Sequence, residues 1–310
     1  MQAGHFGLGL DDSQGCLNCF CSGVTDECSE ARLYWSTLRM PIYDENHGFA
    51  LTDKRQTIDK QNELRIMPAT SELSYQYSPS DKRVYYWALP YQFLGNKIGS
   101  YGGNMTVLQK FTTKSQQGIP LVDSDALMIG NGVSLHFKFD EQRVPNVQER
   151  NKIPMYEQGW FSLRGGRSPA TREDFLKVLS NIEALLVRAT VARDMESTSI
   201  KKVAMDIAVP QMTGGPPTTR AEECRCPPGY RGYSCEESAT GYYRDSNDRS
   251  EGPLGKCSKC PCNDNEQSCS KERNGRVQCV CKEGWSGQYC DSRGRKIIST
   301  NTFYSRDNRI

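Results

Sequence analysis

The residues with the most distinctive chemistry in this chain are its 14 cysteines, which fall into two groups. Four stand close to the N-terminus and ten follow between Cys224 and Cys290, with none between residues 29 and 223. Closely spaced cysteines form either disulfides or zinc sites. Only three histidines are present, and Gly, Pro, Asn and Asp turns surround the cysteines, so disulfides are favoured over zinc. Disulfides indicate an oxidising compartment.

The spacing of these cysteines repeats. Cys16, Cys19, Cys21 and Cys28 recur as Cys257, Cys260, Cys262 and Cys269 at an offset of 241 (257 − 16). Cys224, Cys226 and Cys235 recur as Cys279, Cys281 and Cys290 at an offset of 55 (279 − 224). One cysteine module therefore occurs twice, and its first copy carries residues 29–223 inside a loop. The cysteine-rich flanks have few aliphatic residues, so disulfides must supply the stability that burial cannot.

The inserted residues 29–223 are numerous enough to bury a core of their own and have a mainly β pattern. Strands are predicted at residues 84–89, 105–111, 126–129, 133–139, 159–163, 185–191 and 203–209. The dipeptide Asn131-Gly132 predicts a tight hairpin, because both central positions of a primed turn need positive φ. Short strands at close spacing predict a jelly-roll β-sandwich.

One short helix is predicted in this insert. Thr171 followed by Asp174 resembles a capping box, and an apolar stripe comes directly after it. The stripe consists of Phe175, Val178, Leu179 and Ile182. These positions share one face of a helix, so we expect the helix to close one edge of the sandwich.

Two sets of motifs resemble known extracellular modules. The sequences CPPGYRGYSC at 226–235 and CKEGWSGQYC at 281–290 resemble laminin-type EGF-like modules. The sequences RVYYWALP at 83–90, FLGNK at 93–97, SYGG at 100–103 and IGNGV at 129–133 resemble the laminin IV type A domain. That domain sits inside a split EGF-like module in laminin chains and in perlecan, and the resemblance covers about residues 4–290.

The resemblance implies a domain organisation. Residues 1–18 would end a preceding EGF-like module, 19–28 plus 224–257 would form the split module, and 29–223 the laminin IV type A sandwich. Residues 258–290 would be a second, incomplete module, and 291–310 a tail unlike the family.

The family's disulfide scheme, carried over residue by residue, implies six bonds. They are Cys19–Cys28, Cys21–Cys224, Cys226–Cys235, Cys260–Cys269, Cys262–Cys279 and Cys281–Cys290. Ser238 stands where the split module should have its seventh cysteine, and Arg293 has that position in the second module. Cys16 and Cys257 are therefore unassigned, and we expect them to be free or to pair outside this scheme.

Other residues give no catalytic constellation, and we expect no enzyme, metal or cofactor. His5, His47 and His136 are far apart in the sequence, and His136 lies on the polar phase of its strand, which predicts a solvated side chain. Asp123 and Asp125 are interpreted as turn formers in preference to calcium ligands.

Charge and hydropathy exclude further classes. With 39 basic and 37 acidic residues there is no electrostatic case for nucleic acid, and no apolar run is long enough for membrane insertion. The opening MQAGHFGLGL has no basic leader, so we interpret the chain as a piece of a longer secreted protein. Asn104-Met-Thr106 is the one glycosylation sequon.

Two features are candidate glycan contacts. The aromatic residues Tyr85, Tyr86, Trp87, Tyr91, Phe93 and Tyr101 either fill the core or build a sugar-stacking face, and the core is favoured. The tail places Arg293, Arg295, Lys296, Arg306 and Arg309 against Asp291 and Asp307. Its net charge of +3 suits heparan sulfate, although a disordered solubilising tail is favoured.

The resulting hypothesis is a non-enzymatic structural module of the basement membrane, secreted into the extracellular matrix. Its partners would be other matrix or cell-surface proteins, with heparan sulfate or other glycans as further candidates. The alternative is a lectin-like glycan-binding jelly-roll domain, and a third hypothesis is a secreted hydrolase.

Overall fold

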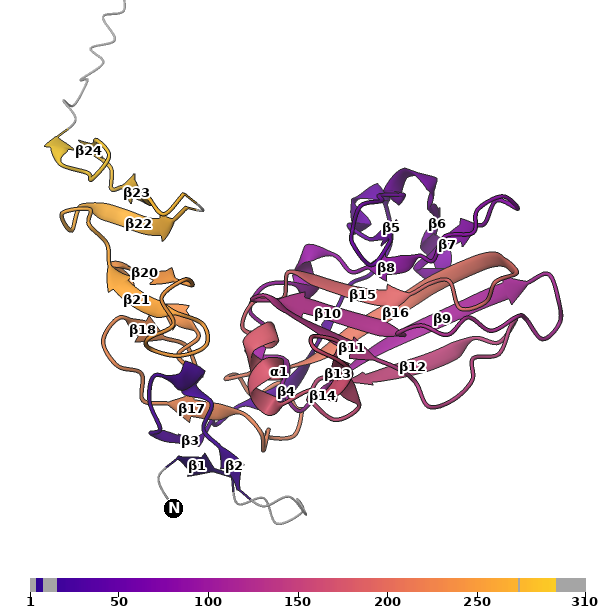
Figure 1. The fold of residues 1–310 in the computed structure, drawn as a ribbon, viewed down its shortest axis with the longest axis horizontal. Helices are drawn as coiled ribbons and strands as arrows, with labels where there is room; N and C mark the ends of the chain where they lie inside the picture. Colours follow the sequence, from indigo (N-terminus) through magenta and orange to yellow (C-terminus); the bar gives the residue numbers. More distant parts are fainter. Residues whose placement is uncertain (1–3, 8–15, 273, 294–310) are drawn as a thin grey trace, which may run out of the picture. The chain divides into compact units, whose positions relative to one another are not determined.

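The computed structural model describes residues 4–7, 16–272 and 274–293, which divide between two compact units (Figure 1). The first unit is Met1–Cys226 with Gly232–Glu236, and the second is Pro227–Arg231 with Glu237–Ile310. The first contains a β-sandwich and the second only small two-stranded sheets. The fold is mainly β, as the sequence predicts.

Two antiparallel sheets form the sandwich in the first unit (Figure 1). The seven-stranded sheet has the order β14 (Ser168–Pro169), β13 (Trp160–Ser162), β11 (Val133–Phe137), β10 (Ala126–Gly130), β15 (Ala184–Arg188), β8 (Tyr86–Ala88) and β5 (Ala50–Thr52). The six-stranded sheet has the order β12 (Glu149–Pro154), β9 (Asn104–Thr113), β16 (Met195–Val209), β7 (Glu72–Gln76) and β6 (Arg65–Met67), and β4 (Tyr34–Arg39) also pairs with β16. The chain crosses repeatedly between the two sheets, as in a jelly roll.

The sandwich core forms from alternating residues on the two inner faces. Trp87, Met128, Leu135 and Val187 come from the seven-stranded sheet, while Leu73, Met105, Val107 and Ile200 come from the six-stranded one. Each of these side chains is fully buried. Because side chains alternate along a strand, this burial fixes the register of both sheets.

Helix α1 (Arg172–Leu179) has the predicted cap, since Thr171 Oγ1 accepts from the Asp174 N–H at 3.0 Å. The Asp174 carboxylate accepts from the Thr171 N–H in return. Phe175 is fully buried and its ring lies 5.7 Å from that of Trp160. The helix thus packs against the sandwich core, as predicted.

The hairpin between β10 and β11 turns at Asn131 and Gly132, whose φ angles are 47° and 73°. Both are left-handed, as a primed turn requires. Six short 3₁₀ helices lie elsewhere among the described residues, at Cys21–Gly23, Glu45–His47, Gln61–Glu63, Pro68–Thr70, Tyr91–Phe93 and Ile98–Ser100.

Two further strand pairs belong to the first unit. They are β1 (His5–Phe6) with β2 (Leu17–Asn18), and β3 (Cys28–Glu30) with β17 (Glu222–Cys224). In the second pair Cys28 lies opposite Cys224, so the chain enters and leaves the insert on adjacent strands.

The second unit consists of two-stranded sheets. These are β18 (Tyr230–Arg231) with β19 (Glu237–Ser238), β20 (Tyr242–Asp245) with β21 (Lys256–Lys259), β22 (Glu266–Lys271) with β23 (Val277–Cys281), and β24 (Trp285–Ser286) with β25 (Ser292–Arg293). Its main buried cluster is made of Cys260, Cys262 and Cys290 with three further cysteines and Trp285 around them. Disulfide sulfurs therefore replace an aliphatic core.

Candidate structural site at the split cysteine module

The structure brings together the sulfur atoms of all six expected cysteine pairs. The bonds are Cys19–Cys28, Cys21–Cys224, Cys226–Cys235, Cys260–Cys269, Cys262–Cys279 and Cys281–Cys290. The cysteines outside these bonds are Cys16, which is exposed, and Cys257, which is buried. Among the described residues, the close groups with metal-ligand atoms consist of these bonded cysteines, joined in one group by Glu222.

The Cys21–Cys224 bond closes the insert. It joins residues 203 apart in sequence, across a Cα–Cα distance of 5.6 Å. In the chain-entropy model such a loop corresponds to an upper stabilisation of about 5 kcal/mol. The neighbouring β3–β17 pair holds the same two chain ends side by side.

Glu222 holds the entry strand by its side chain. One carboxylate oxygen accepts from the Phe20 N–H at 2.8 Å and the other from the Cys21 N–H at 3.1 Å. The residue is only 4 % exposed. A buried carboxylate that receives two backbone N–H groups is well compensated for its lost hydration.

Arg172 connects this carboxylate to the sandwich. It is the first residue of α1, and its guanidinium lies 3.3 Å from Glu222 Oε2 and donates to the Asn18 carbonyl at 2.7 Å. The guanidinium also lies 5.1 Å from the centre of the Tyr101 ring. Burial raises the pKa of the Tyr101 phenol, so the ring faces Arg172 in its neutral form. We call Glu222, Arg172 and the Cys21–Cys224 bond the clamp.

Sequence reasoning missed the ionic half of the clamp. Glu222 and Arg172 are 50 residues apart. Neither belongs to a recognisable motif. Only the position of Glu222, two residues before Cys224, could have pointed to it.

Cys257 lies where the family scheme would place a disulfide with position 238, which is Ser238 here. Its backbone N–H donates to the Tyr230 hydroxyl at 2.9 Å, and that hydroxyl donates to Glu251 at 2.6 Å. Burial raises the pKa of the Cys257 thiol, and it raises the pKa of Tyr230 to about 12. The thiol therefore stays protonated and weakly nucleophilic at neutral pH.

The prediction of a solvated His136 is wrong. The residue is 7 % exposed, its Nδ1 lies 3.0 Å from Ser124 Oγ, and its ring stacks on Phe161. The loop before β10 and the neighbouring strand β13 cover the face of β11 on which His136 lies. Burial lowers the pKa of His136.

The Ser124–His136 pair is the closest approach to a hydrolase arrangement among the described residues. Ser124 is 7 % exposed, so a substrate cannot reach its hydroxyl. His47 is also buried, and its Nδ1 accepts from the Phe49 N–H at 3.0 Å. His5 lies in the separate strand β1. The three histidines do not converge.

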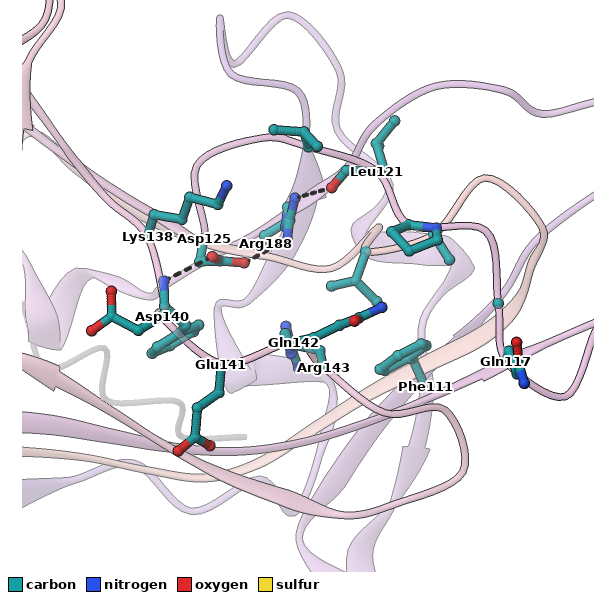
Figure 2. A pocket seen from close by; sticks show the side chains of 16 residues that line it. Phe111, Gln117, Leu121, Asp125, Lys138, Asp140, Glu141, Gln142, Arg143 and Arg188 are labelled. Atoms are coloured by element: carbon teal, nitrogen blue, oxygen red, sulfur yellow. Dashed lines mark hydrogen bonds and ion pairs between the residues drawn. The ribbon is translucent and has the colours of Figure 1, made fainter.

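Figure 2 shows a cavity whose lining includes both Asp125 and Arg188, and its volume is about 220 Å³. Asp125 lies 2.6 Å from Arg188 and accepts from the Phe139 N–H at 3.0 Å. Arg188 also donates to the Leu121 carbonyl at 2.7 Å. Asp123 forms an ion pair with Lys54 outside this lining. Both aspartates that were candidate calcium ligands are therefore paired with a cationic side chain of the protein.

The six aromatic residues weighed as a sugar-stacking face are mostly internal. Tyr85, Tyr86, Trp87, Phe93 and Tyr101 are each at most 3 % exposed, whereas Tyr91 is 78 % exposed. One exposed ring does not make a stacking platform. The tail weighed for heparan sulfate falls outside the described residues from position 294 onwards.

Asn104 is the first residue of β9 and is half-buried. Its backbone N–H donates to Asp206 at 3.0 Å. Thr106 of the sequon follows on the same face of the strand.

Comparison with known proteins identifies a matching protein family. The model of the family described as Laminin B (Domain IV) matches residues 86–223. The mouse "Basement membrane-specific heparan sulfate proteoglycan core protein" is 33 % identical over 93 % of the chain and 8 % of its own length. Mouse "Laminin subunit alpha-1" is 29 % identical over 94 % of the chain and 10 % of its own length. The chain thus spans about a tenth or less of these relatives.

Among solved structures, the "L4b Domain of Human Laminin alpha-2" aligns with 57 % of the chain and 99 % of that domain. The identity is 20 % and the TM-score 0.49. Separately, none of the helices in the described part of the chain is long and apolar enough to cross a membrane.

Proposed function

We propose that the chain, whose residues 86–223 match the laminin B (domain IV) family, is a non-enzymatic structural and protein-binding module of a secreted basement-membrane protein. The similarity to a basement-membrane proteoglycan and to a laminin α chain supports this role. The clamp is the observation that supports this role most strongly, because the bond between Cys21 and Cys224 attaches the whole sandwich to one loop of a small cysteine module.

The same proposal includes the domain boundaries and the bonds. Residues 1–18 end one EGF-like module, 19–28 plus 224–257 form the split module, 29–223 the sandwich, 258–290 a second module and 291–310 a tail. The six disulfides are its framework, with Cys16 and Cys257 left as thiols. Four pairs are only 9 residues apart in sequence, which fits small loops that cannot build a hydrophobic core.

Retention in a cell-derived matrix tests the proposed role. The labelled, secreted chain is added to a detergent-extracted basement-membrane matrix, which is then washed with high salt. We expect retention, because a protein contact with a desolvated centre survives salt that screens surface charges. A variant with Cys21→Ala and Cys224→Ala should be retained less. Complete loss of the unaltered chain in the wash would contradict the proposal.

We also propose Asn104 as a glycan attachment site. The residue starts a strand on the outer side of the sandwich and directly follows a turn. Chain secreted from a glycosylating host should shift in mobility after glycosidase treatment, and Asn104→Gln should remove the shift. Identical mobility before and after the enzyme would refute the site.

A further inference from the structure

Cations gather on the outer face of the six-stranded sheet. Along β9, Val107 and Gln109 point into the sandwich and are buried, so Thr106, Leu108 and Lys110 point outward. The same alternation places Arg150 and Lys152 of β12 outward, on either side of the buried Asn151. We call this surface the basic face, and its cations are Arg39, Arg65, Lys110, Arg150, Lys152, Lys201 and Lys202.

Strand register shows that these cations form rows across the sheet. One row runs Lys152, Thr106, Ala204, Arg39, and the next runs Arg150, Leu108, Lys201, Glu72. A third runs Lys110, Ser199, Ser74, Arg65. With strands about 4.8 Å apart, each row is about 14 Å wide. The cations therefore stand as an extended array instead of one compact cluster.

Lys202 lies between the first two rows at a break in the strand register. The pairing of β16 with β9 shifts between Lys201 and Ala204, and Lys202 has a left-handed φ of 50°. This bulge adds an exposed cation to the middle of the face.

A groove of about 640 Å³ lies between these rows. Arg39, Arg150 and Lys202 line it together with Thr106, Leu108 and Asp206. Two aliphatic residues of the lining, Leu108 and Val203, are 7 % and 1 % exposed and therefore already covered. Met40, Pro41 and Ala204 also line the groove and are at least partly exposed. Beside this apolar part, the groove offers a ligand positive charge and hydrogen-bond donors from Arg39, Arg150 and Lys202.

Internal partners neutralise little of this charge. Glu72 lies 3.4 Å from Lys201, and Asp206 accepts from the Asn104 N–H. Within the described part of the chain, the structure shows no ion pair for Arg39, Lys110, Arg150, Lys152 or Lys202. Seven cations against these two carboxylates give +5 on one face (7 − 2), whereas the whole chain carries +2.

We propose that the basic face binds a sulfated glycosaminoglycan, which deepens the proposed function by naming one class of matrix partner. A long polyanion complements an extended array of cations. A protein partner would need a large apolar or aromatic anchor to bury, and no aromatic residue of the described part of the chain lines this groove. Arginine and lysine without internal partners are suited to sulfate oxygens.

A second basic groove serves as the matched control. It has a volume of about 650 Å³ and is lined by Lys82, Lys114 and Arg193, which are all exposed. Asp81 and Asp194 also line it, and Arg83 pairs with Asp81 at 3.2 Å. Its charge is therefore more nearly balanced.

Heparin affinity of the full chain tests the proposal. The test variant is Arg39→Glu, Arg150→Glu and Lys152→Glu, and the control is Lys82→Glu, Lys114→Glu and Arg193→Glu. Both change the net charge equally. Loss of three exposed ion pairs should weaken heparin binding by about tenfold or more in the test variant and only slightly in the control. Binding of the unaltered chain should also weaken steeply with salt.

Several results would overturn the proposal. They are absence of heparin binding by the unaltered chain at physiological salt, equal loss in the two variants, and equal binding to polyglutamate, which has no sulfates. A further variant with Arg295, Lys296, Arg306 and Arg309 changed to Ser must keep its affinity, since its loss would assign binding to the tail.

Two controls keep the outcome decisive. Near-UV circular dichroism reports folding, and Arg39→Gln, Arg150→Gln and Lys152→Gln replace the test variant if the glutamates disturb the sheet. Salt-resistant retention in the matrix is measured alongside. Retention without heparin binding would refute only glycosaminoglycan binding by the basic face. Heparin binding without salt-resistant retention would refute only the protein-binding role.

Discussion

The sandwich and the second cysteine module show two different ways of holding a chain. In the sandwich, side chains such as Trp87, Trp160 and Phe175 are removed from water, and no disulfide crosses its two sheets within the described residues. Around Cys262 the buried cluster is made almost entirely of disulfide sulfur. Burial therefore stabilises the insert, while covalent bonds stabilise the second cysteine module.

Reduction of the disulfides should give the largest effect, because it removes the covalent stabilisation and leaves the burial of side chains in place. Loss of each native disulfide from a small module costs about 2–5 kcal/mol, and residues 258–290 have three. We expect amide hydrogen exchange to show complete loss of protection in that module and retained protection in β9 and β16. Equal loss in both regions would contradict the distinction.

Trp160→Ala should have the opposite regional effect. The side chain is 2 % exposed and packs against Phe137 and Phe175, so its truncation should destabilise the sandwich by about 3–5 kcal/mol. Tyr91→Ala is the matched control, because that ring is 78 % exposed. Urea unfolding followed by tryptophan fluorescence measures both, and protection of the second module should not change.

Glu222→Ala should weaken the contact between the split cysteine module and the sandwich. It leaves Arg172 without its carboxylate and two buried backbone N–H groups without an acceptor, which costs about 3 kcal/mol. We expect faster hydrogen exchange at Phe20 and Cys21 first. Glu27→Ala, which removes the exposed partner of Arg225, is the control and should have almost no effect.

Thr171→Ala removes the N-cap of α1 and should destabilise the sandwich by about 1 kcal/mol. Thr171→Ser retains the hydroxyl and should restore most of that loss. A shift in thermal midpoint for both variants alike would mean that the methyl group matters more than the cap.

The last effect concerns pH and is absent at neutral pH. Burial lowers the pKa values of His136 and His47 in the folded chain, so the unfolded chain binds protons more readily. Stability should therefore be complete above about pH 6.5 and fall as the pH decreases below it, by at most about 1.4 kcal/mol per pH unit for each histidine. His136→Gln should reduce this dependence between pH 7.5 and 5.5 in chemical unfolding. An unchanged slope would contradict it.

Local signals explain what could be predicted from the sequence. The Thr171 cap and the Asn131-Gly132 turn each depend on neighbouring residues, and the structure has the helix and the hairpin there. Strand β12 was missed because it is largely polar, with only Asn151 and Ile153 pointing inward. Its place in the sheet comes from pairing with β9, which no local pattern records.

Contacts between distant segments explain the rest. His136 stands on a polar phase, yet the loop carrying Ser124 covers it. Tyr86 is buried although its neighbours Tyr85 and Trp87 already face the core, because Leu127 and Leu186 pack against it on the other side of the sheet. The clamp and the basic face likewise arise from residues that only the topology brings together.

The most direct test of the split module is to map the disulfides of the secreted, unreduced chain by peptide mass spectrometry with free thiols alkylated. We predict a peptide pair joined through Cys21 and Cys224, and alkylation at Cys16 and Cys257. A bond from Cys21 to any other cysteine, or the absence of label on both thiols, would contradict it.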